Sequence, residues 1–105
     1  MVILETSVFT RQLQKLLTDD EYKELQLSLV RQPDLGRIIV GSGGLRKVRW
    51  GLRGRGKRGG TRVIYYWVTQ TDRLLMLLIY DKTDQEDLTR EQIKILKNII
   101  EAEYK

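Results

Sequence analysis

The sequence has no histidine and no cysteine, and only one proline, among its 105 residues. The lack of cysteine excludes a disulfide framework, a thiol nucleophile and a cysteine-ligated zinc site. The lack of histidine excludes an imidazole general base and a histidine-bound metal. Long apolar runs and the features of a signal peptide are also missing, so we expect no membrane span and a cytoplasmic location. Any catalysis must use Lys, Arg, Tyr, Ser, Thr and carboxylates, and we predict no cofactor and no metal site.

Basic residues are concentrated in the middle of the chain. Residues 37–62 contain nine Lys and Arg and no acidic residue. Residues 1–36 carry four basic and six acidic groups, and residues 63–105 carry six and eight, so each flank has a net charge of −2. Uncompensated charge of this kind costs self-repulsion on folding and is typical of a surface that binds a polyanion. Nucleic acid is the first candidate partner and an acidic protein is the second.

The hydrophobic pattern predicts a single α+β domain over residues 1–105. In chain order, the expected elements are a strand over 1–5, a helix capped by Ser7, a helix that opens with the Thr18 capping box, a short extended piece over 38–40, strands over 45–52, 61–68 and 74–80, and a helix capped by Thr89. The last three strands form an antiparallel sheet, and we expect the helices to cover one face of it. The segment 74–80 is apolar almost throughout, which predicts a central strand with both faces buried.

Four cations stand on or beside these strands. Alternation along 45–52 places Lys47 and Arg49 on one face, opposite Val48 and Trp50. Arg62 lies on the next strand, and Lys82 follows the last strand. We predict that Lys47, Arg49, Arg62 and Lys82 converge on one concave surface, although a solvated sheet face would show the same pattern.

RNA is a substrate that such a cluster could cleave, because RNA supplies its own 2′-hydroxyl nucleophile. In-line attack on the adjacent phosphate gives a 2′,3′-cyclic phosphate and a 5′-hydroxyl. Arginine stabilises the phosphoryl oxygens, and a lysine among other cations can act as a base. An aromatic side chain can stack on a base, and Tyr80 is the candidate we favour. The predicted RNA-binding residues are Arg46, Arg53, Arg55, Lys57, Arg58 and Tyr80.

Two further patterns have simpler explanations. The G-x-G-x-x-G run over 54–59 is followed by a β-pattern, whereas a dinucleotide-binding loop opens a helix. The acidic pairs Asp19/Asp20 and Glu86/Asp87 stand at predicted helix starts, where we expect them to interact with the helix dipole. Neither pattern predicts a catalytic or metal site.

The strings GSGGLRKVRWGLRGRGKRGGTRVIYYWV and LLIYDKTDQEDLT resemble the RelE/HigB superfamily of bacterial toxins. Within it, the HigB-like, phage-derived branch is the most similar. This resemblance implies the RelE-like fold, with an N-terminal strand and helical hairpin, a three-stranded antiparallel sheet and a C-terminal helix. It also implies the toxin of a type II toxin–antitoxin system, which enters the ribosome and cuts mRNA without a metal. Carried over by motif, Lys47, Arg49, Arg62 and Lys82 would be the catalytic residues.

The resemblance further implies partners. These are the ribosome with its mRNA and rRNA, and a HigA-like antitoxin with a helix-turn-helix domain. The sequence departs from the pattern at Leu88, where relatives carry a tyrosine that stacks on the substrate. Two alternatives stay open: a ParE-like toxin that inhibits gyrase on the same scaffold, and an RNA-binding module that does not cleave.

Overall fold

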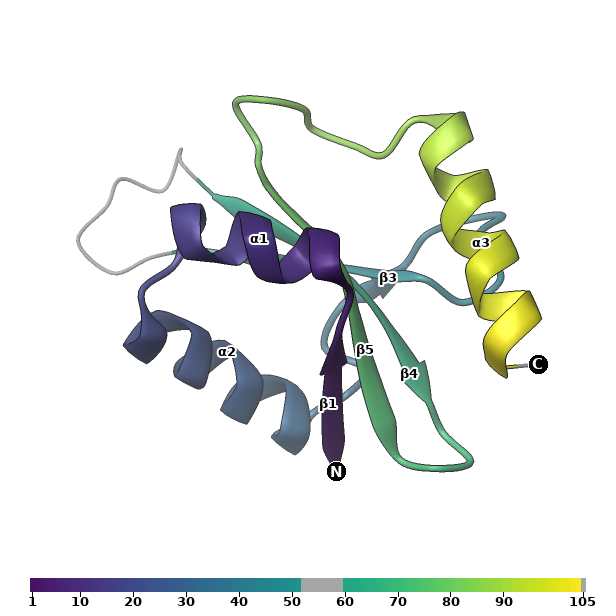
Figure 1. Ribbon diagram of the computed structural model, residues 1–105, viewed down its shortest axis with the longest axis horizontal. Helices are drawn as coiled ribbons and strands as arrows, with labels where there is room; N and C mark the ends of the chain where they lie inside the picture. Colours follow the sequence, from purple (N-terminus) through teal and green to yellow (C-terminus); the bar gives the residue numbers. More distant parts are fainter. Residues whose placement is uncertain (52–59, 105) are drawn as a thin grey trace.

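The computed structural model describes residues 1–51 and 60–104, which form a five-stranded sheet with helices on both faces (Figure 1). The elements are β1 (Val2–Glu5), α1 (Ser7–Leu16), α2 (Asp19–Arg31), β2 (Arg37–Ile38), β3 (Arg46–Trp50), β4 (Thr61–Val68), β5 (Arg73–Asp81) and α3 (Arg90–Tyr104). The strand order is β1-β5-β4-β3-β2. β1 is parallel to β5, and every other pair is antiparallel. The predicted α+β class and three-stranded antiparallel core are confirmed, and a short edge strand is added on each side.

Two of the three helix starts follow the expected sequence signal. The Thr18 side chain accepts from the Glu21 N–H, and the Glu21 carboxylate accepts from the Thr18 N–H, which completes the predicted capping box of α2. Thr89 and Gln92 make the same reciprocal pair before α3. These pairs satisfy backbone donors that the first turn of a helix leaves free.

The expected start of α1 is displaced by one residue. Thr6, and not Ser7, caps this helix, because the Thr6 hydroxyl accepts from the Phe9 N–H at 3.0 Å. The same hydroxyl donates to the Leu77 carbonyl of β5 at 2.9 Å. The cap therefore ties α1 to the central strand, a tertiary contact that the local pattern does not contain.

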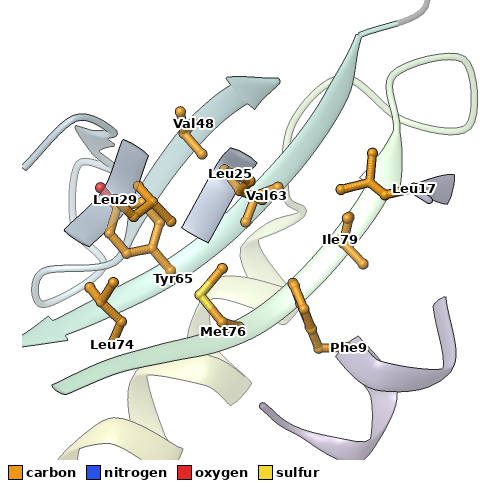
Figure 2. Close-up of a cluster of buried hydrophobic side chains, with 10 residues drawn as sticks. All are labelled: Phe9, Leu17, Leu25, Leu29, Val48, Val63, Tyr65, Leu74, Met76 and Ile79. Atoms are coloured by element: carbon orange, nitrogen blue, oxygen red, sulfur yellow. The ribbon is translucent and has the colours of Figure 1, made fainter. Parts of the chain in front are cut away.

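The expectation that all helices cover one face is wrong. Leu74 and Met76 of β5 belong to a core with α1 and α2, whereas Leu75 and Leu77 belong to a second core with α3. Figure 2 shows the first core, which contains Phe9, Leu17, Leu25, Leu29, Val48, Val63, Tyr65, Leu74, Met76 and Ile79. A central strand that is apolar on both faces needs a layer on each side to exclude water.

Candidate functional site

Three of the predicted catalytic cations share one face of the sheet. Arg49 lies opposite Arg62 in the β3–β4 register, and Lys47 lies opposite Ile64. Ile64 packs in the α3 core, and residues directly opposite each other in an antiparallel pair project to the same side. Tyr80 lies opposite Arg62 in the β4–β5 register and joins the same face. The sheet therefore places Lys47, Arg49, Arg62 and Tyr80 beside the apolar layer that α3 covers.

Arg62 is the most firmly held of these cations. Its residue is 4% exposed, and its Nη2 donates to Glu86 Oε1 at 3.2 Å and to Oε2 at 3.3 Å. Its Nε is buried without a hydrogen-bond partner among the described residues. A buried guanidinium requires an opposite charge, and Glu86 supplies it. The result is a positive charge in a defined position, on a guanidinium whose Nε has no acceptor among the described residues.

The loop between β5 and α3 covers the cation cluster with two neighbouring carboxylates. Glu86 Oε1 lies 3.7 Å from Arg49 Nη2 as well as contacting Arg62. The Lys47 ammonium donates to Asp87 Oδ1. This hydrogen bond is the main reason that the pKa of Asp87 lies below its usual range, so Asp87 stays ionised at neutral pH.

These contacts correct the expectation that Glu86 and Asp87 serve the dipole of the last helix. That helix begins at Arg90, so both carboxylates lie outside its first turn. The Asp19/Asp20 pair, in contrast, does occupy the first turn of α2. Glu86 and Asp87 are thus the site residues that the sequence reading missed.

Tyr80 is a protonated donor at the margin of the cluster. Its side chain is half-buried, and its hydroxyl donates to the Glu86 carbonyl at 3.5 Å. Burial, followed by the nearby charge of Asp87, raises the pKa of Tyr80 to about 12. The phenol therefore keeps its proton throughout the neutral range.

Lys82 and Arg46 make no hydrogen bond or ion pair with the described residues of this cluster. The backbone N–H of Lys82 donates to the Gly60 carbonyl at 3.1 Å, but no side-chain hydrogen bond or ion pair joins Lys82 to another described residue. Arg46 lies opposite Tyr65 on the other face, where its Nη1 donates to the Gly36 carbonyl at 2.8 Å and so supports the chain between α2 and β2. The predicted binding residues Arg53, Arg55, Lys57 and Arg58 lie outside the described residues.

Residues 1–51 and 60–104 contain neither a cluster suited to a metal ion nor a helix suited to span a membrane. Within these ranges, no group of three or more acidic side chains is arranged to hold a metal ion. None of the helices there combines the length and apolar character needed to cross a bilayer.

Comparison with known proteins gives a family and a fold. The model of a family described as the RelE toxin of the RelE/RelB toxin–antitoxin system matches residues 1–104. The isolated E. coli RelE toxin has a similar structure, with a TM-score of 0.60 at 13% identity over 93% of this chain and 97% of that chain. A chain of the intact E. coli RelBE toxin–antitoxin complex gives 0.58 at 13% identity over 74% and 92%. A mutant of E. coli RelE in the free state gives 0.59 at 13% identity over 81% and 86%.

Proposed function

This chain belongs to the RelE toxin family, and on that basis we propose that it is a metal-independent endoribonuclease that cleaves mRNA on the ribosome. The observation that carries the proposal is the convergence of Lys47, Arg49 and Arg62 on the carboxylates of one loop. Two guanidinium groups and an ammonium that bind carboxylates can also bind a phosphate at the same position.

The chemistry uses a nucleophile that the substrate brings. The 2′-hydroxyl loses its proton and attacks the adjacent phosphorus, while the bond to the 5′-oxygen breaks and that oxygen gains a proton. Arg62 and Arg49 stabilise the negative charge that accumulates on the non-bridging oxygens. Lys47, once its ammonium has released a proton to solvent, would accept the proton of the 2′-hydroxyl, and the protonated Tyr80 would give a proton to the leaving 5′-oxygen. The products are a 2′,3′-cyclic phosphate and a 5′-hydroxyl.

The ends of cleaved mRNA test this proposal. We expect cells that express the chain to accumulate cuts within translated regions, with 5′-hydroxyl ends downstream of each cut. Cells that express Arg62→Ala serve as the control. Broken DNA with intact mRNA would contradict the proposal and favour a gyrase inhibitor, and RNA binding without cuts would favour a non-catalytic module.

We also propose that substrate phosphates displace Glu86 and Asp87. The double substitution Glu86→Gln with Asp87→Asn removes both carboxylates but keeps the size of the side chains. We expect the affinity for a single-stranded 2′-O-methyl RNA, which cannot be cleaved, to rise about 2- to 30-fold, because the RNA no longer competes with the two carboxylates for the cations, and exposed ion pairs are weak. Fluorescence anisotropy at fixed salt measures the change.

The matched control is Asp84→Asn with Glu91→Gln, because these carboxylates flank the same loop and make no ion pair with a described cation. Unchanged RNA affinity together with lost mRNA cleavage would contradict displacement. That result would instead make one carboxylate the proton acceptor of the reaction.

The family supports an antitoxin as partner, since the solved RelBE complex contains a chain of similar fold. We propose a HigA-like antitoxin with a helix-turn-helix domain, which would be the product of an adjacent gene. The proposed ribosomal substrate places the protein in the cytoplasm. Co-purification of the two gene products tests this partner.

A further inference from the structure

A groove of about 570 Å³ follows the outer edge of β3, next to the cation cluster. β2 pairs with β3 only through Arg37↔Lys47 and Ile38↔Arg46, so among the described residues the later part of β3 pairs with β4 on one side and has no strand on its outer side. The groove is lined by Leu35, Arg37, Lys47, Val48, Arg49 and Trp50. Its volume lies within the range of small-ligand sites.

The lining combines an aromatic ring with three cations. Trp50 is half-buried and packs against the core of α1 and α2, so its indole is supported from behind. Leu35 is 37% exposed and supplies a second apolar surface. Arg37 is exposed and makes no ion pair or side-chain hydrogen bond with another described residue. No carboxylate is among the described residues that line the groove.

The groove is continuous with the cation cluster because Lys47 and Arg49 belong to both. These two residues lie on one face of β3, about 7 Å apart along the strand. Trp50 lies on the opposite face of β3, against the core of α1 and α2. A polynucleotide whose phosphate lies between Arg49 and Arg62 would therefore pass around the outer edge of β3 to place its neighbouring nucleotide in the groove, which is lined from both faces of this strand. Stacking on an indole favours any base, and the cations favour the backbone that connects the bases.

We propose that this groove is a nucleotide subsite for single-stranded RNA, in which a base stacks on Trp50 and the adjoining phosphate contacts Arg37. The inference builds on the proposed ribonuclease function, and it assigns roles to Leu35, Arg37 and Trp50. It also supplies a stacking surface at the outer edge of β3, away from Leu88, which lies in the loop between β5 and α3.

An extended acidic peptide that adds a strand to β3 is the other occupant of such an edge. RNA is favoured by the indole, because stacking rewards a planar base, and by the exposed arginine that lies beyond the two shared cations. A peptide strand would gain its affinity from the β3 backbone and would not require the indole.

Trp50 fluorescence tests the subsite without any cleavage. The chain has two tryptophans, and Trp67 is replaced by phenylalanine so that Trp50 alone reports. The Trp67 Nε1 is buried without a hydrogen-bond partner in the described ranges, so Trp67→Phe removes no hydrogen bond there. A short 2′-O-methyl oligoribonucleotide is titrated at low salt, beside inorganic polyphosphate of equal charge and an acidic peptide. We expect saturable quenching by the RNA alone.

Substitutions then assign the contacts. We expect Trp50→Leu to weaken RNA binding about 5- to 150-fold, Trp50→Phe to retain most of the affinity, and Arg37→Gln to weaken binding and lower its salt dependence. The control is Arg31→Gln, an exposed arginine in the last turn of α2. Circular dichroism shows whether each variant is folded.

The proposal is wrong if RNA binds without quenching Trp50, or if polyphosphate quenches as strongly as RNA. It is also wrong if folded Trp50→Leu and Trp50→Phe bind RNA with equal affinity, or if only the acidic peptide quenches. The readout is independent of the proposed cleavage. If wild-type protein cuts mRNA but Trp50 is not quenched, the subsite is wrong and the ribonuclease stands. If Trp50 is quenched by RNA but no mRNA is cut, the subsite stands and the ribonuclease proposal is wrong.

Discussion

Replacing Arg62 with alanine is expected to lower the rate of mRNA cleavage on the ribosome about 100- to 1,000-fold, as loss of one preorganised donor to a developing oxyanion does in other enzymes. The reason is the fixed position of the guanidinium, which is 4% exposed and has Glu86 as its carboxylate partner. The charge is therefore in place before substrate arrives. Single-turnover cleavage of a programmed ribosome measures the rate, and growth arrest gives a second readout.

Two further variants separate the charge of Arg62 from its packing. Arg62→Met fills much of the same buried space without charge, so we expect it to fold and to be as inactive as Arg62→Ala. Arg62→Lys keeps a charge but loses the planar fork, and we expect intermediate activity. Arg73→Gln, an exposed residue at the first position of β5, is the control and should cleave at the wild-type rate. Full growth arrest by a folded Arg62→Ala variant would contradict the proposed mechanism.

A methyl group at position 60 is expected to disable the site without touching a charged residue. A Cβ added at Gly60 would lie 2.5 Å from Arg62 Nη1, which is closer than real Cβ atoms approach a heavy atom. The Arg62 side chain is enclosed, so its guanidinium must shift within the site. We expect Gly60→Ala to lower the cleavage rate about 10- to 100-fold, because displacements of about 1 Å at a reacting centre have effects of this order.

Gly51 offers a matched control for this substitution. A Cβ added at Gly51 meets nothing within 4 Å, and neither Gly51 nor Gly60 has a positive φ. Gly51→Ala should therefore cleave at the wild-type rate, and the ratio of the two variants isolates the displacement of Arg62. Equal rates for Gly60→Ala and Gly51→Ala would show that the position of Arg62 does not limit cleavage.

The sequence predicts those parts of the fold that depend on patterns within a few residues. The reciprocal pairs at Thr18 and Thr89 and the interior place of β5 in the sheet follow from patterns within a few residues. The cap of α1 and the side of the sheet that α3 covers depend on contacts between distant segments. The position of α3 could nevertheless have been predicted from β5. This strand is apolar on both faces, and a strand buried on both sides requires a covering layer on each side.

The site is predicted in part. Alternation along β3 correctly places Lys47 and Arg49 on one face, and the antiparallel register adds Arg62. Arg46 is a neighbour in sequence, but alternation sends it to the opposite face, where it bonds the Gly36 carbonyl. The partners Glu86 and Asp87 could not be predicted from helix starts, since the path of the loop after β5 brings them to the cations.

The parallel pairing of β1 with β5 also determines when the protein can fold. Thr6 and Leu77, which are joined by a hydrogen bond, are 71 residues apart in the sequence. Contacts between such distant segments form slowly, and they cannot form during synthesis until β5 has left the ribosome. The loop that carries Glu86 and Asp87 comes directly after β5 in the sequence. The two carboxylates therefore leave the ribosome soon after the strands that carry the cations. The complete five-stranded sheet therefore cannot form on the ribosome before β5 has emerged.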